Sequence, residues 1–284
     1  MIAVTGAGGK TGLAVVKALA ERGVAVRGLV RKEADQERLA AAGGRESVVG
    51  MLEDRTTLEK LMRDVRAVYY ICPNMHPDEV AIGATLLETA QVAGVQHFVY
   101  HSVLHPQTQA MSHHWHKLLV EERIFASGLP FTILQPTAYM QNLLGYWNTI
   151  RDAGVYAVPY PVSTRLSLVD VNDVAEVAAR VLTEPGHAGA TYELVGTLPL
   201  TQIQVAECLS AELRRSVVAK EVALEQWEQG VRQQGVSGYA LQTLRQMFSY
   251  YAANGLVGNP QVLGWLLGRA PVSLEEFVQR TAAQ

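Results

Sequence analysis

Near its amino terminus the chain reads Val4-Thr5-Gly6-Ala7-Gly8-Gly9-Lys10-Thr11-Gly12. The stretch follows a short apolar run at residues 2–4 and precedes apolar residues at helical spacing over residues 13–22. Glycines between a strand and a helix let the chain turn tightly and let a phosphate approach the backbone. We expect Gly6 to permit the turn and Gly12 to let helix and strand pack closely. Gly8 and Gly9 would lie against a pyrophosphate.

Lys10 and Thr11 are also expected to contact the cofactor, and they lie just before the amino end of this helix. Its free N–H groups and the positive end of its dipole favour an anion. Gly9-Lys10-Thr11 also resembles the end of a nucleoside-triphosphate loop. That loop needs a glycine five positions before the Gly-Lys pair, where this chain has Val4. The motif therefore predicts a dinucleotide site and not a triphosphatase.

Two cations follow the second predicted strand, at Arg31 and Lys32. An NAD site usually has an acidic residue here, which accepts from the ribose 2′-hydroxyl. A guanidinium instead matches the geometry of a 2′-phosphate. We therefore expect NADPH to be preferred and NADH to be the less favoured cofactor.

Strands and helices alternate through the first half of the chain, which predicts an α/β fold with a doubly wound parallel sheet of Rossmann type. The expected strands cover residues 2–4, 24–30, 46–49, 67–71, 97–103 and 131–134, and the expected helices cover residues 13–22, 33–42, 57–64, 78–93 and 115–127. After Pro136 the alternation loosens and becomes mostly helical. We expect a dinucleotide-binding domain over residues 1–155. Residues 156–284 would hold the remaining sheet elements and a small, mostly helical C-terminal substrate lobe.

Composition narrows the class of protein. The net charge is −3 and the charged residues are mixed along the chain, so no basic face for nucleic acid is expected. Two cysteines form neither a disulfide framework nor a zinc site. No apolar run is long enough for a membrane span, and no signal peptide precedes the first strand. These features predict a cytoplasmic protein whose partner is a small molecule.

Several later segments, together with the spacing of Gly6, Gly9, Gly12 and Arg31, resemble the NmrA-like group of atypical short-chain dehydrogenase/reductases. These segments are Lys117-Leu118-Leu119-Val120-Glu121, Ser127-Gly128-Leu129-Pro130-Phe131-Thr132-Ile133-Leu134-Gln135-Pro136, Tyr139-Met140-Gln141-Asn142-Leu143-Leu144 and Leu168-Val169-Asp170-Val171-Asn172-Asp173-Val174-Ala175. The resemblance covers roughly residues 1–195. It implies an NADP-binding Rossmann domain and either a reductase or a redox-sensing regulator that binds a protein partner without turnover.

The resemblance also assigns roles on the helix after the fifth strand. Typical short-chain dehydrogenases carry Tyr-x-x-x-Lys there, and Lys117 fits the lysine. His113 stands where the tyrosine would be, which argues against tyrosine-type carbonyl reduction and against a sugar-nucleotide epimerase. Lys117, His113 and Ser102 are the candidate catalytic residues.

Ligands of open α/β sheets bind beyond the carboxyl ends of the strands. The cofactor contacts expected there are Cys72 and Pro73 after the fourth strand, and Pro136 and Tyr139 after the sixth. Lys117 would hold the nicotinamide ribose. Aromatic residues after residue 136 would line an apolar pocket or pack in the core.

Five histidines lie between residues 101 and 116: His101, His105, His113, His114 and His116. One of them could donate a proton, because imidazole titrates near neutrality. No nearby acid or cysteine completes a metal-binding set, so no metal is expected. The sequence thus predicts an NADPH-dependent reductase of a flat apolar substrate such as a quinone, with a non-catalytic sensor as the alternative.

Overall fold

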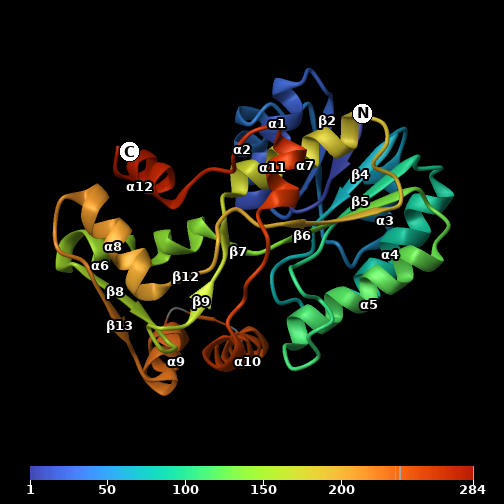
Figure 1. The fold of residues 1–284 in the computed structure, drawn as a ribbon. Helices are drawn as coiled ribbons and strands as arrows, with labels where there is room; N and C mark the ends of the chain where they lie inside the picture. Colours follow the sequence, from blue (N-terminus) through green and yellow to red (C-terminus); the bar gives the residue numbers. More distant parts are fainter. Residues whose placement is uncertain (234, 237, 284) are drawn as a thin grey trace. The chain divides into compact units, whose positions relative to one another are not determined.

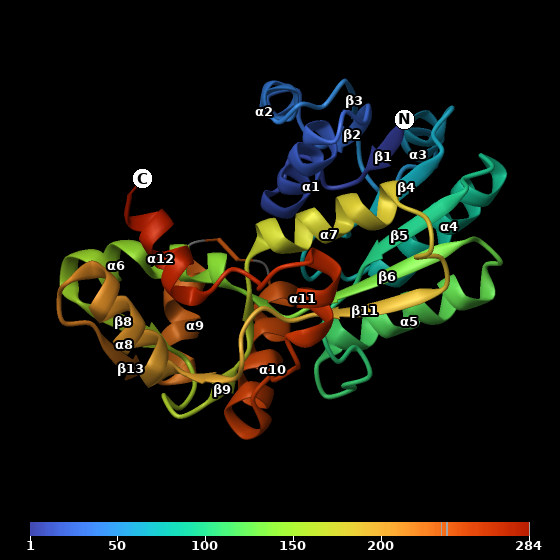
Figure 2. The ribbon, with the colours of Figure 1, turned by 45° about the horizontal axis from the view of Figure 1, so that its top comes forward.

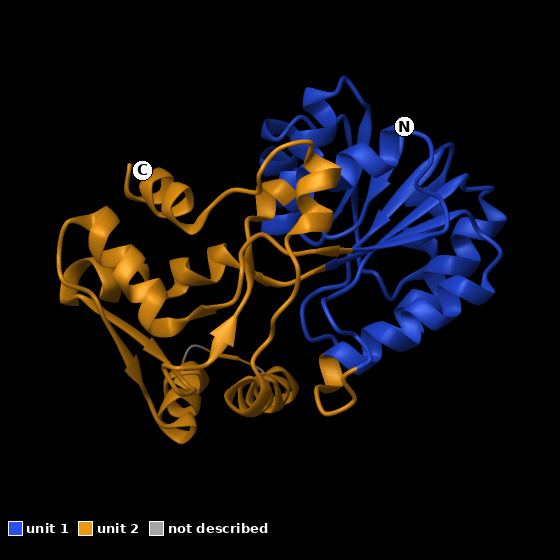
Figure 3. Ribbon diagram, viewed as in Figure 1, with its two compact units in different colours: residues 1–107, 114–135, 174–192 blue, residues 108–113, 136–173, 193–284 orange. Residues whose placement is uncertain are grey.

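The computed structural model describes residues 1–233, 235, 236 and 238–283. The described chain forms two compact units (Figure 3). Unit 1 comprises residues 1–107, 114–135 and 174–192, and unit 2 comprises residues 108–113, 136–173 and 193–284. The chain therefore leaves unit 1 and returns to it, and neither unit is one continuous segment.

Unit 1 is built on a seven-stranded sheet in the order β11-β6-β5-β4-β1-β2-β3 (Figure 1). Its strands are β1 (Ile2–Val4), β2 (Val26–Val30), β3 (Glu46–Val49), β4 (Ala67–Tyr70), β5 (His97–His101), β6 (Phe131–Pro136) and β11 (Ala190–Leu194). Neighbouring strands from β3 to β6 pair in parallel. The order reverses at β1, so the carboxyl ends of β1 and β4 mark the switch point where ligands bind to such sheets.

Helices connect these strands: α1 (Lys10–Glu21), α2 (Asp35–Ala41), α3 (Arg55–Met62), α4 (Glu79–Val92), α5 (Ser112–Ala126) and α7 (Val171–Thr183). One face of the sheet packs against α3, α4 and α5 through a core that includes Tyr70, Phe98 and Tyr100. Figure 2 shows α1 and α7 on the other side of the sheet. Both faces are covered, as the run of buried residues in β4 and β5 requires.

Unit 2 contains short strands and most of the later helices. Its elements are β7 (Ala138–Tyr139), η1 (Met140–Tyr146), α6 (Trp147–Ala153), β8 (Val155–Val158), β9 (Arg165–Leu166), β10 (Leu168–Val169), β12 (Leu200–Thr201), α8 (Gln202–Leu213), β13 (Val218–Glu221), α9 (Leu224–Gln233), α10 (Gly238–Asn254), α11 (Gln261–Leu267) and α12 (Leu274–Ala282). The strands form three two-stranded pairs, β10 with β7, β12 with β9 and β13 with β8.

The expected α/β class and Rossmann-type sheet are confirmed, and most predicted elements lie within a few residues of the observed ones. Two helices begin three residues before their expected starts: α1 at Lys10, and α5 at Ser112, so that His113 and His114 belong to the first turn of α5. The short strands β9 and β10 are separated by Ser167 alone. Among the described residues, no helix is long and apolar enough to cross a membrane.

Candidate functional site

The glycine turn between β1 and α1 has the shape that close backbone approach requires. Gly6 has a φ of 57°, in the left-handed region that glycine adopts without strain. The Gly9 N–H donates to the Gly6 carbonyl at 2.9 Å, which closes the turn. A Cβ on Gly12 would lie 2.2 Å from the Gly6 oxygen, so no larger residue fits there.

The amino end of α1 has no side-chain cap. Its N-cap residue is Gly9, which has no side chain to accept a hydrogen bond from the first turn. A helix amino terminus without such a cap favours an anion through its N–H groups and its dipole. The turn and the uncapped helix together fit the pyrophosphate of a dinucleotide, with Lys10 and Thr11 in the first turn.

Two cations, Arg31 and Lys32, and two acids, Glu33 and Asp35, follow the end of β2. Arg31 and Lys32 are exposed, and neither forms an ion pair with another described residue. Asp35, which the sequence analysis did not single out, packs against Gly8: a Cβ on Gly8 would lie 3.2 Å from its carboxyl carbon. Asp35 also pairs with Arg38 at 3.4 Å. The charges beside the glycine turn are therefore mixed.

Lys117 is buried and forms an ion pair and hydrogen bonds within unit 1. Its Nζ donates to Oε1 of Glu79 at 2.7 Å and to the His101 carbonyl at 3.2 Å. The side chains of Lys117 and Glu79 are 6% and 1% exposed, so water screens this pair little. The Lys117 ammonium also lies 5.4 Å from the centre of the Tyr100 ring. These contacts hold the ammonium beside the carboxyl end of β5.

Ser102 directly follows β5 and contacts a second buried carboxylate. Its hydroxyl donates to Oε1 of Glu121, which lies one turn after Lys117 on α5. The Gln135 amide donates to both Glu121 oxygens, at 2.9 and 3.1 Å. Burial raises the pKa of Glu121, and the hydrogen bonds from Ser102 and Gln135 oppose that rise.

Two of the five histidines are neutral at physiological pH. Burial lowers the pKa of His101 to about 3, and its Nδ1 is hydrogen-bonded to the Tyr69 hydroxyl. Burial lowers the pKa of His114 to about 4. His113 is buried in the first turn of α5, four residues before Lys117. Neither His101 nor His114 can serve as a protonated acid near pH 7.

The loops after β4 and β5 contain backbone strain. Met75 and His105 have φ values of 56° and 55°, which are rare for residues with a side chain. Such strain often accompanies functional sites. Cys72 and Pro73 lie in the first of these loops, and burial raises the pKa of Cys72 to about 12, so its thiol stays protonated. Cys72 can therefore contact a ligand, but it is no nucleophile at neutral pH.

In unit 2, Pro136 ends β6, and Tyr139 lies in β7, where it is paired with Val169. The acidic motif after β10 is tied to the C-terminal helices. Asp170 pairs with Arg280, and Asp173 pairs with Arg269 at 2.7 Å. Both aspartates are fully buried, so this motif anchors the end of the chain.

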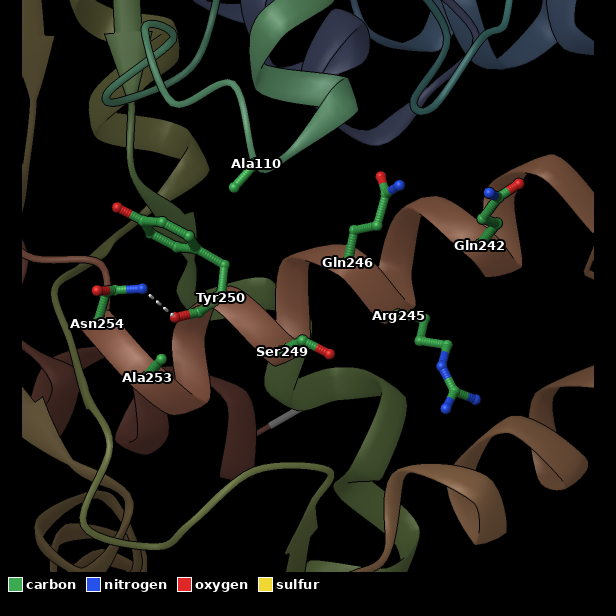
Figure 4. A pocket seen from close by; sticks show the side chains of 8 residues that line it. All are labelled: Ala110, Gln242, Arg245, Gln246, Ser249, Tyr250, Ala253 and Asn254. Atoms are coloured by element: carbon green, nitrogen blue, oxygen red, sulfur yellow. Dashed lines mark hydrogen bonds between the residues drawn. The ribbon is translucent and has the colours of Figure 1, made fainter.

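Aromatic residues of unit 2 pack mainly against one another. Tyr160 contacts Phe248 and Tyr251, and Phe248 also contacts Trp227 with ring centres 4.8 Å apart. A groove of about 520 Å³ runs along α10 (Figure 4). Its lining residues are Ala110, Gln242, Arg245, Gln246, Ser249, Tyr250, Ala253 and Asn254. None of them is a predicted site residue.

A doubly wound parallel sheet with an uncapped glycine turn at its switch point defines a Rossmann-type dinucleotide-binding protein. The chain belongs to the NmrA-like family, which it matches over residues 1–281. The resemblance inferred from the sequence is therefore confirmed.

Individual relatives match over nearly the whole chain. It is 31% identical to the NAD(P)H azoreductase of Xenophilus azovorans, over 100% of this chain and 98% of that protein. It is 26% identical to quinone oxidoreductase 2 of Escherichia coli, over 98% of this chain and 97% of that protein. The crystal structure of Citrobacter sp. triphenylmethane reductase complexed with NADP(H) matches with a TM-score of 0.86 and 25% identity, covering 99% of this chain and 100% of that one.

Proposed function

We propose that this protein is an NADPH-dependent reductase of flat, conjugated, apolar acceptors such as quinones. The observation that carries the proposal is the uncapped amino end of α1 above the Gly6–Gly12 turn, which fits a dinucleotide pyrophosphate. The names of the relatives supply the reaction class. An azo dye, a quinone and a triarylmethane dye are all extended π systems that accept two electrons.

Specific residues would hold the cofactor. The backbone of Gly8, Gly9 and Thr11 would face the pyrophosphate, and the exposed Arg31 would pair with the 2′-phosphate. When bound, NADPH supplies a hydride to the acceptor. The protein's part is to position both molecules and to exclude water, so no protein nucleophile is required.

Lys117 and Ser102 would act at the nicotinamide end. Reduction of a quinone places negative charge on an oxygen, and a buried ammonium stabilises that charge. Two of the three Lys117 N–H bonds point to Glu79 and His101 within the described part of the chain, which leaves one for a ribose or substrate oxygen. The proton would come from Lys117, from one of His105, His113 and His116, or from water, since His101 and His114 are neutral.

A small-molecule acceptor and a dinucleotide are the partners that this function needs. A protein partner belongs to the alternative, a sensor that binds NADP(H) without turnover. We also place the protein in the cytoplasm, where its two cysteines would remain as the free thiols seen here.

The test is steady-state reduction of a quinone, an azo dye and a triarylmethane dye with NADPH, for the wild type and two Lys117 variants. Lys117→Met should lower turnover about 10²-fold or more, the scale of a lost acid or electrostatic contact. Lys117→Arg keeps the charge and should retain more activity. Equal turnover of wild type and Lys117→Met would remove Lys117 from the site. No turnover by the wild type, with tight NADPH binding, would favour the sensor.

A further inference from the structure

We propose that Glu79 is a positioning residue that holds Lys117 in its charged form beside the nicotinamide site. This inference rests on the proposed function, in which Lys117 touches the cofactor or the substrate. Glu79 acts through Lys117 and need not contact either ligand itself.

Glu79 is placed for this task by the start of α4. It is the first residue of the helix and is 1% exposed, so its carboxylate lies in the favourable field of the helix amino end. Its Oε1 accepts from Lys117 Nζ at 2.7 Å and from the Tyr100 hydroxyl at 3.2 Å. The Tyr100 hydroxyl fixes the carboxylate, and the carboxylate fixes the ammonium.

The groups around Lys117 leave Glu79 as its closest counter-charge. The titratable groups that face or interact with it are Glu79 from α4, Tyr100 and His101 from β5, Cys72 from the loop after β4, and Glu121 and His114 from α5. Desolvation keeps His101 and His114 uncharged, and the tyrosine and the thiol remain protonated. The Glu121 carboxylate accepts hydrogen bonds from Ser102 and Gln135, and not from Lys117.

Stability alone does not account for this arrangement. A buried ion pair gains little over a well-packed apolar pair, because removing both ions from water offsets their attraction. The pair does keep an ammonium charged in a place where burial would otherwise neutralise it. An ammonium directed by Glu79 and the His101 carbonyl is what stabilisation of a reduced oxygen needs.

The experiment is a pH profile of kcat for quinone reduction with NADPH. In Glu79→Gln the ammonium loses its counter-charge, so activity should fall off at a pH about one to three units lower than in the wild type. The decline of kcat at high pH is the alkaline limb of the profile. Glu79→Asp retracts the carboxylate and should also move this limb to lower pH, but by a smaller shift than Glu79→Gln. Lys117→Arg should abolish the limb, because a guanidinium does not deprotonate in this range. Glu121→Gln is the matched control. Glu121 is a buried carboxylate one turn after Lys117 on α5, but it has no hydrogen bond to Lys117, so its replacement should move the limb less than Glu79→Gln does.

A purely structural role for Glu79 would lower kcat equally at every pH and leave the limb in place, which would overturn the proposal. If Glu79→Gln does not fold, an unmoved limb in Glu79→Asp overturns it equally. The proposed function fails separately: Lys117→Met would then turn over as fast as the wild type. With a slow Lys117→Met and an unmoved limb in the Glu79 variants, only the role of Glu79 is wrong.

Discussion

Replacing Lys117 with methionine should destabilise the protein through the charge it leaves behind. Methionine keeps an unbranched side chain of similar length, so little cavity forms, but Glu79 remains buried without its ammonium. Coulomb's law gives roughly 6 kcal/mol of attraction across 2.7 Å at an effective dielectric constant of about 20. Removing one partner of such a buried pair typically costs about 3–5 kcal/mol, because part of the attraction is offset by desolvation of the missing ion.

The assay is urea unfolding at pH 7 of four proteins: wild type, Lys117→Met, Glu79→Gln and the double variant. The double variant leaves no buried charge without a partner. It should therefore be more stable than Lys117→Met and recover most of the free energy of unfolding lost in that variant. A loss below about 1 kcal/mol, the range of exposed ion pairs, would refute the claim that this pair is buried and unscreened.

Four further changes test other parts of the site. Arg31→Ala should weaken NADPH binding by about 1.5–3 kcal/mol and spare NADH, and calorimetry showing equal losses would remove Arg31 from the 2′-phosphate site. Gly9→Val should block NADPH binding while urea unfolding stays cooperative, since a branched side chain would displace the pyrophosphate; unchanged binding would mean that the phosphates lie elsewhere. Burial lowers the pKa of His114 from 6.5 to about 4, so the unfolded chain takes up this proton more readily than the folded protein does. The free energy of unfolding should therefore fall by about 3 kcal/mol as the pH drops from 6.5 toward 4. His114→Gln should flatten that slope in thermal unfolding and His116→Gln should not; equal slopes would contradict the burial of His114. Asp35→Asn should raise the preference for NADPH by removing a carboxylate beside Gly8, and an unchanged ratio of the two dissociation constants would place Asp35 away from the 2′-phosphate.

The local features of this chain could be predicted from its sequence. The glycine turn, the alternation of strands and helices and the lysine on α5 depend on spacing within a few residues, which periodicity and turn chemistry report. The same is true of the cations after β2, whose exposure leaves them available for a phosphate.

The partners of the site residues could not be predicted, because they come from distant segments. Glu79 lies 38 residues before Lys117 and looks like an ordinary first-turn acid of α4 until the two helices are placed on the sheet. Arg280 lies 110 residues after Asp170, so its pairing is invisible in the sequence. The burial of His101, His113 and His114 likewise depends on segments packed around them and could not be read from the sequence.

The central claim is that this chain turns over NADPH and does not merely bind it. The most direct measurement is anaerobic rapid mixing of the wild type with a slight excess of NADPH and a soluble quinone, followed at the nicotinamide absorbance band. We expect the band to disappear within seconds, one hydroquinone to form per NADPH consumed, and NADH to react more slowly. A nicotinamide band that persists for minutes, with NADPH bound to the protein, would contradict it.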